Sequence, residues 1–284
     1  MELMANNTLL IGLPASGKST FIAALWDLLN DSDSNNYKLK MNSRPAERTF
    51  LEGIYDKWVG FEKLDRTKID SIESVSLSIL KGENSLELNF PDLAGEVFVD
   101  MYRYREISKD IEALIKSCNS IVVFINPEFL TVERHIDDVY PNSSTRVEGA
   151  ELSVNVEEVT NQNLHNKLQS QVVLTDLLYG FFKIQPLIRK VAVVVSAWDC
   201  VESSGLGFSP EKYLKGTCPL LYMYLKNGNF SHKIYGVSAQ GCNYKKTEDL
   251  EKLQNLTKSV DRIKVVDDNI MSNDISMPLN WLLE

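Results

Sequence analysis

Short apolar runs alternate along the chain with segments in which apolar residues recur at helical spacing. Such runs are typical of strands buried on both faces of a sheet, and they span residues 8–11, 121–125, 191–195 and 234–237. The segments with helical spacing span residues 21–29, 47–58, 101–116, 167–183 and 249–256. This alternation predicts an α/β fold around a mostly parallel sheet.

Three further patterns complete the expected elements. Residues 75–80 and 86–90 have the composition of strands, and the turn between them is typical of a hairpin. The hairpin is expected to add one antiparallel strand at the edge of the sheet. Residues 263–266 resemble a strand, and residues 276–278 are suited to begin a last short helix.

Composition and charge narrow the function classes. The 284 residues are 44% hydrophobic and 24% charged, which excludes a disordered or collagen-like chain. The formal net charge of −9 opposes non-specific binding to nucleic acid, so no such partner is expected. The four cysteines form no Cys-x-x-Cys pair, as expected of reduced thiols in a cytoplasmic protein without a structural metal. No secretory signal and no apolar stretch near the ~18 residues of a membrane helix is present, so we expect no membrane anchor.

Residues 128–165 differ from the rest of the chain. They carry eight acidic residues against two basic ones. We interpret them as an exposed acidic insertion, which serves either as a docking surface for a partner or only as a solvated loop.

The strongest chemical signal follows the first apolar run. Residues 12–19, Gly-Leu-Pro-Ala-Ser-Gly-Lys-Ser, match the phosphate-loop pattern G-x-x-x-x-G-K-[ST] between a strand and a helix. Backbone N–H groups converge there on phosphates, and the helix dipole favours their charge. Lys18 is expected to reach the β- and γ-phosphates, and the Ser19 hydroxyl is expected to bind Mg²⁺. The remaining nucleotide contacts are assigned to Gly12, Ala15, Ser16, Gly17 and Thr20.

Two later motifs address the choice of nucleotide, because the loop alone also suits ATP-dependent small-molecule kinases. Asp92 ends a strand where a second Mg²⁺ contact is expected, and Gly95 can bring a backbone N–H against a γ-phosphate. Only a triphosphate would hold that N–H, so loss of the γ-phosphate would release the segment around Gly95 and act as a switch.

The second motif concerns the base. Asp199, shortly after the 191–195 run, can accept from N1–H and the 2-amino group of guanine, two donors that adenine lacks. Ser238 and Ala239 follow the next run, where the Ala239 N–H can meet guanine O6.

These motifs together resemble those of the TRAFAC-class P-loop GTPases of the Ras and Arf kind, over almost the whole chain. More narrowly, residues 196–199 (Ser-Ala-Trp-Asp) and 278–283 (Pro-Leu-Asn-Trp-Leu-Leu) resemble the bacterial double-GTPase proteins of conflict (defence) systems. The resemblance implies a partner, either a protein or a second GTPase subunit in a homo- or heterodimer. Such proteins come as pairs, and this chain has one phosphate loop.

The sequence departs from the usual GTPase pattern at two places. Ser196-Ala197-Trp198 precede Asp199 where [NT]-K-x is usual, and Ser196 and Trp198 are assigned to the nucleotide site. Trp198 either covers the base in place of the lysine or packs in the core. Glu96 stands where Ras-like enzymes have a glutamine that orients water. Its charge repels the γ-phosphate, so we expect slow intrinsic hydrolysis.

The first switch needs a hydroxyl before the strand at residue 75. Thr67 is our candidate Mg²⁺ ligand, with Thr49 and Ser71 as alternatives, and Arg66 is either an arginine finger in cis or a solvated surface charge.

The expected fold is accordingly a P-loop NTPase three-layer sandwich over residues 1–284, with one GTPase domain and a long first-switch region at 37–73. We expect Mg²⁺-dependent hydrolysis of GTP to GDP and phosphate, used as a conformational switch. The alternatives are a binding module that holds GTP with little hydrolysis and an ATP-dependent small-molecule kinase.

Overall fold

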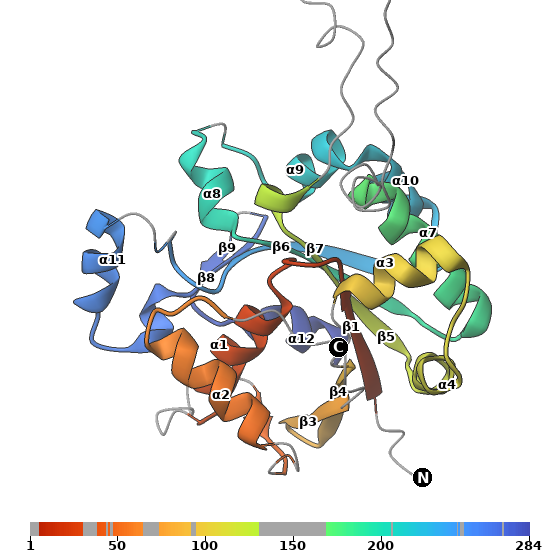
Figure 1. Cartoon of the computed structure of the whole chain (residues 1–284), viewed down its shortest axis with the longest axis horizontal. Coiled ribbons are helices and arrows are strands. Elements are labelled where there is room, and N and C mark those ends of the chain that lie inside the picture. Colours follow the sequence, from red (N-terminus) through yellow and green to blue (C-terminus); the bar gives the residue numbers. More distant parts are fainter. Residues whose placement is uncertain are drawn as a thin grey trace, which may run out of the picture.

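The computed structural model contains a nine-stranded mixed sheet with the order β2-β3-β4-β1-β5-β6-β7-β8-β9 (Figure 1). It describes residues 6–30, 39–43, 45, 48–64, 74–91, 95–130, 169–205, 207–242, 244, 247–268 and 270–284. The strands are β1 (Asn6–Gly12), β2 (Lys40–Met41), β3 (Ser74–Lys81), β4 (Asn84–Pro91), β5 (Ser120–Ile125), β6 (Lys190–Ser196), β7 (Ser231–Ser238), β8 (Lys264–Asp267) and β9 (Ile270–Ser272).

The helices lie between these strands in the chain. They are α1 (Lys18–Asn30), α2 (Arg48–Val59), α3 (Gly95–Tyr104), α4 (Lys109–Ser117), α7 (Ser170–Ile184), α8 (Trp198–Ser203), α9 (Pro210–Thr217), α10 (Pro219–Asn227), α11 (Thr247–Gln254) and α12 (Met277–Leu282), with the 3₁₀ turns η2 (Pro127–Phe129) and η3 (Ser259–Arg262). Among the described residues, none of these helices is both long and apolar enough to cross a membrane.

The centre of the sheet is parallel, as the apolar runs predict. The five strands of this centre pair side by side and run parallel, in the order β4, β1, β5, β6 and β7. The predicted hairpin is confirmed, since β3 pairs with β4 in antiparallel register. The prediction of a single antiparallel edge strand is wrong, because β8 runs antiparallel to β7 at the other edge and β9 returns beside it. A turn through Asp268, which has a left-handed φ of 48°, reverses the chain between β8 and β9.

Alternate side chains of the central strands enter two separate cores. Leu10, Val122 and Val194 pack with α1, α2 and α12 on one face of the sheet. Ile11 and Val123 pack with α3, α4, α7 and the helices after β6 on the other face (Figure 1). This explains why the central strands are apolar at almost every position.

The prediction of one continuous helix over residues 101–116 is wrong. It is divided into α3 and α4 at Arg105, which has a left-handed φ of 58° and donates its N–H to the Met101 carbonyl at 3.0 Å. The Ser108 hydroxyl then accepts from the Ile111 N–H at 3.3 Å and begins α4. Neither glycine nor proline marks the break, so the helical spacing conceals it.

Two lysines from distant strands hold the last helix, α12. Lys190 of β6 donates to the Trp281 carbonyl at 3.0 Å, and Lys81 of β3 donates to the Asn280 carbonyl at 3.1 Å. The final carbonyls of a helix lack partners within it, and they attract positive charge. Since β4, β1 and β5 lie between β3 and β6, these bonds tie α12 across the middle of the sheet.

The carboxyl ends of the parallel strands carry the predicted site, as is usual in open α/β sheets. The phosphate loop follows β1, and Ser196 and Ser238 are the last residues of β6 and β7. Residues 128–130 of the acidic segment are described, and its remainder from residue 131 onward lies outside the described residues.

Candidate nucleotide-binding site

The phosphate loop joins the end of β1 to the start of α1. Two of its residues have a left-handed backbone, Ala15 with φ 59° and Gly17 with φ 87°, and the Ser16 N–H donates to the Leu13 carbonyl at 3.1 Å. Turns of this kind direct successive N–H groups to one side and form a concave anion site. The loop therefore has the backbone shape that phosphate binding needs, at the N-terminus of a helix.

The Lys18 ammonium lies inside this loop. Its Nζ donates to the Gly12 carbonyl at 2.6 Å and to the Ser16 hydroxyl oxygen at 3.2 Å. Burial lowers the pKa of Lys18 to about 8, and the negative charge of Glu96 acts in the opposite direction. Because its present acceptors are neutral oxygens, a phosphate would be a stronger partner for the ammonium.

Side chains from the ends of two neighbouring strands hold the loop in place. The Ser196 hydroxyl lies 2.8 Å from the Ser16 carbonyl oxygen and 3.2 Å from the Ile125 carbonyl oxygen. Asn126, directly after β5, donates its side-chain N–H to the Ala15 carbonyl at 2.9 Å. The loop is thus attached to the sheet at two consecutive carbonyls. Ser196 was predicted to belong to the nucleotide site, whereas Asn126 was not predicted.

Gly95, the first residue of α3, packs directly against the phosphate loop. A Cβ at this position would lie 2.2 Å from the Pro14 nitrogen and 2.4 Å from the Leu13 carbonyl carbon, so only glycine permits the approach. Glu96 follows it, partly buried, with its charge acting on Lys18. The structure therefore brings Gly95 and Glu96, which were both predicted to face the γ-phosphate, to the phosphate loop.

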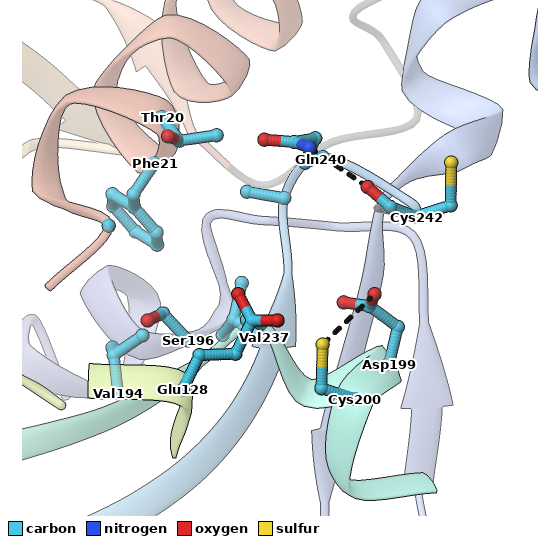
Figure 2. A pocket seen from close by; sticks show the side chains of 13 residues that line it. Thr20, Phe21, Glu128, Val194, Ser196, Asp199, Cys200, Val237, Gln240 and Cys242 are labelled. Carbon is cyan, nitrogen blue, oxygen red and sulfur yellow. Dashed lines mark hydrogen bonds between the residues drawn. The ribbon is translucent and has the colours of Figure 1, made fainter. Parts of the chain in front are cut away.

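A pocket of about 120 Å³ opens beside the phosphate loop, beyond the ends of β6 and β7 (Figure 2). Phe21 of α1 lies on one side of it and Asp199 of α8 on another. Five residues that the sequence analysis assigned to the nucleotide line this one pocket, namely Gly17, Thr20, Ser196, Asp199 and Ala239. They come from three separate parts of the chain, so the sheet topology brings them together.

Hydrogen bonds orient the Asp199 carboxylate in this pocket. The Ser238 hydroxyl donates to Asp199 Oδ1 at 2.7 Å, and the same hydroxyl oxygen accepts from the Gly241 N–H at 3.3 Å. Since a carboxylate has about four acceptor positions, Asp199 keeps capacity for further donors. Ser238 thus acts on Asp199 and does not line the pocket itself.

Trp198 is part of the core and does not line the pocket. Its side chain is 1% exposed, and its ring meets that of Tyr213 edge-on at 5.8 Å. A Cβ on Gly236 would lie 2.3 Å from the Trp198 ring, so the ring covers that glycine. Of the two roles that the sequence left open for Trp198, the structure shows the core role, and the assignment to the nucleotide site is corrected.

Four polar residues of the pocket were not predicted, namely Glu128, Cys200, Gln240 and Cys242. Burial and the nearby carboxylates of Asp199 and Glu128 raise the pKa of the Cys200 thiol to about 12, so it stays protonated. Glu128 belongs to the turn η2, Cys200 and Gln240 directly follow the predicted residues Asp199 and Ala239, and Cys242 lies three positions after Ala239. Adjacency to Asp199 and Ala239 was the only signal in the sequence.

The predicted residues Asp92, Thr67 and Arg66, and the alternative Ser71, lie outside the described residues. The other alternative, Thr49, is exposed in the first turn of α2. Of the proposed Mg²⁺ ligands, Ser19 is described, in the first turn of α1 beside Lys18. A hydroxyl at this position fits the ion, because the Ser or Thr after the lysine of a phosphate loop usually holds Mg²⁺ together with phosphates and waters.

The arrangement can hold a nucleotide at two points. The phosphate loop, with Lys18 inside it, offers donors and positive charge, and the adjoining pocket offers a carboxylate and backbone groups to a base. Gly17 of the loop also lines the pocket, and Ser196 of β6 lines the pocket and contacts the loop at the Ser16 carbonyl, so phosphates and base would be bound side by side.

A family model agrees with this arrangement. The family model described as Double-GTPase 1 matches residues 9–282. The comparison with curated proteins finds no match. A crystal structure described as nucleolar GTP-binding protein 1 from Plasmodium falciparum is similar, with 13% sequence identity, coverage of 89% of this chain and 90% of that chain, and a TM-score of 0.37.

Proposed function

The chain belongs to the Double-GTPase 1 family and is a GTP-binding protein, and we propose that it hydrolyses GTP to GDP and phosphate as a Mg²⁺-dependent conformational switch. We also interpret its fold as the three-layer sandwich of P-loop NTPases, with residues 128–165 as an insertion.

The observation that carries the proposal is the shared pocket of Gly17, Asp199 and Ala239. With phosphates on the loop, a base in this pocket would face the Asp199 carboxylate, which accepts from the guanine N1–H and 2-amino groups. Adenine has neither of these donors and would leave a charge unpaired, which costs affinity. The Ala239 N–H would complete the recognition at guanine O6.

Hydrolysis requires water to attack the γ-phosphorus in line with the bond that breaks. A new bond forms between the water oxygen and phosphorus, the bond to the β–γ bridging oxygen breaks, and the proton that the water loses passes to the phosphate product or to solvent, leaving GDP and phosphate. Lys18 would exchange its Gly12 and Ser16 acceptors for phosphate oxygens and stabilise the charge of the transition state. Gly95 would donate its N–H to the γ-phosphate, and Glu96 would orient the water.

The ion would be held by Ser19 together with Asp92 and Thr67, and bound Mg²⁺ would neutralise charge on the β- and γ-phosphates. Glu96 carries a negative charge toward the γ-phosphate, so the intrinsic rate is expected to be slow. Arg66 is our candidate for a positive charge that would offset it.

Two other functions compete with this proposal. Glu96 favours a module that holds GTP and hardly cleaves it, because the charge of Glu96 acts on Lys18 and would act on the γ-phosphate as well. The second competitor is an ATP-dependent small-molecule kinase, which the phosphate loop alone allows. Asp199 in the pocket argues against the kinase.

Nucleotide affinity and single-turnover hydrolysis, with GTP compared with ATP and Mg²⁺ present, separate these functions. Our proposal expects GTP binding and phosphate release that Lys18→Ala abolishes, and a loss of GTP preference in Asp199→Asn. Bound but uncleaved GTP would establish the binding module. A preference for ATP would overturn the assignment of Asp199.

The cellular role rests on the resemblance to the double-GTPase proteins of conflict systems. We propose that the chain acts in the cytoplasm, in bacterial defence, with a protein partner or a second GTPase subunit. Sedimentation of the pure chain with GDP and with a non-hydrolysable GTP analogue tests for a homodimer.

A further inference from the structure

A side chain from a distant helix holds the loop that follows β7. The indole Nε1–H of Trp58 in α2 donates to the Ala239 carbonyl at 3.0 Å, although 181 positions separate the two residues. Both are buried, with Trp58 1% and Ala239 8% exposed. In such surroundings, a carbonyl that lost its donor would carry the full cost of desolvation, so this bond strongly favours one orientation of the peptide.

Trp58 is itself fixed by an arginine of η3. The Arg262 guanidinium lies 3.5 Å from the centre of the Trp58 ring, and its Nη2 donates to the Trp58 carbonyl at 2.6 Å. Arg262 also packs beneath the loop, because a Cβ on Gly241 would lie 2.9 Å from the Arg262 carbonyl oxygen. Gly241 has φ 91°, a conformation that favours glycine. The indole is therefore held rigidly against residues 239–241.

The orientation of this peptide determines where its donors point. In a trans peptide the C=O and the following N–H point in opposite directions. Because the Ala239 carbonyl points toward α2, the Gln240 N–H of the same peptide points away from α2. The hydrogen bond from Trp58 thereby also fixes the backbone of Ala239 at the peptide that follows it. Ala239 and Gln240 both line the pocket, whereas Trp58 acts on it only through the loop.

We propose that Trp58 is a positioning residue for base recognition, whose indole N–H holds the Ala239–Gln240 peptide so that this loop donates to guanine O6. The inference rests on the proposed function, since it assumes that guanine occupies the pocket. It also connects α2, which lies in the predicted first-switch region at 37–73, with the base end of the site.

The test compares GDP with 2-aminopurine riboside diphosphate, which keeps the 2-amino group but lacks both O6 and the N1 hydrogen, by calorimetry on the full chain. Trp58→Phe keeps an aromatic ring beneath Arg262 and removes the N–H. We expect it to weaken GDP about three- to tenfold, the range for one hydrogen bond, and to leave the analogue unchanged. The control is Trp26→Phe, which makes the same substitution in the same core, on α1.

Equal weakening of GDP and the analogue would assign Trp58 a merely structural role and overturn the inference. A preference of the wild-type chain for GDP over the analogue that is unchanged in Trp58→Phe would also overturn the inference. A wild-type chain that binds both ligands equally would overturn the proposed function first, and the inference with it. Should Trp58→Phe fail to fold, Trp58→benzothienylalanine, which has the shape of tryptophan without the N–H, allows the same comparison.

Discussion

Adding one methyl group at Gly95 is expected to separate α3 from the phosphate loop. The Cβ of alanine would lie 2.2 Å from the Pro14 nitrogen, 2.4 Å from the Leu13 carbonyl carbon and 2.5 Å from the Pro14 Cα. Ordinary contacts need about 3.5 Å, so the shortfall is about 1.3 Å. All three atoms belong to the backbone, and Ser196 and Asn126 hold that loop, so α3 has to move.

Two measurable effects follow from this displacement. Overpacking by one methyl group costs about 1–3 kcal/mol, which urea denaturation of the free protein measures directly. A hydrogen bond to a charged group is worth about 1.5–3 kcal/mol, so losing the Gly95 N–H from the γ-phosphate is expected to weaken GTP binding ten- to a hundredfold. GDP lacks that phosphate, and its affinity is expected to change much less.

Gly180→Ala is the matched control for Gly95→Ala. Gly180 lies within α7, and nothing lies within 4 Å of a Cβ built there. The same methyl group is therefore expected to stabilise the protein, by about 0.5–1 kcal/mol. A Gly95→Ala protein as stable as Gly180→Ala, with an unchanged ratio of GTP to GDP affinity, would refute the reasoning.

Three shorter tests address other parts of the site. Burial lowers the pKa of Lys18 to about 8 in the nucleotide-free protein, and a bound phosphate favours the charged form of this side chain, so calorimetric GDP affinity is expected to fall about tenfold from pH 7 to pH 9. Arginine stays charged over this range, so a fall of the same size in Lys18→Arg would assign the pH dependence to another group. Ser196→Ala removes a hydroxyl that anchors the phosphate loop and is expected to cost about 1 kcal/mol of GDP affinity, whereas the exposed Ser203→Ala is expected to cost nothing. In Gly236→Ala the new Cβ would lie 2.3 Å from the Trp198 ring, and urea denaturation is expected to show a loss of about 1–3 kcal/mol. A loss that persists unchanged in a Trp198→Leu background would not come from this contact.

Local patterns predicted the central sheet and the phosphate loop, because both depend on neighbouring residues. Apolar runs identify buried strands, and the spacing from Gly12 to Ser19 specifies a loop between a strand and a helix. The break between α3 and α4 was missed, since Arg105 takes a left-handed backbone that glycine normally marks. Strand β9 was missed because it has three residues, too few for a pattern, and exists only through its pairing with β8.

The site was predictable where each residue follows its own strand. Asp199 and Ala239 were identified in this way, and the parallel order of β6 and β7 brings them into one pocket. Contacts between distant segments left no trace in the sequence. Glu128 enters the pocket from the turn after β5, and Trp58 reaches Ala239 across 181 positions, so only the folded chain reveals these two contacts.

The attachment of α12 to two distant strands has a consequence for synthesis. The acceptors of Lys81 and Lys190 lie 199 and 91 positions further along the chain. A ribosome delivers residues in order, at about 5–20 per second. Both lysines therefore leave it many seconds before their carbonyl partners exist. Until then the part of the α1-face core that Leu279 and Leu282 of α12 complete is uncovered, and we expect the nascent chain to be more prone to aggregation during that interval.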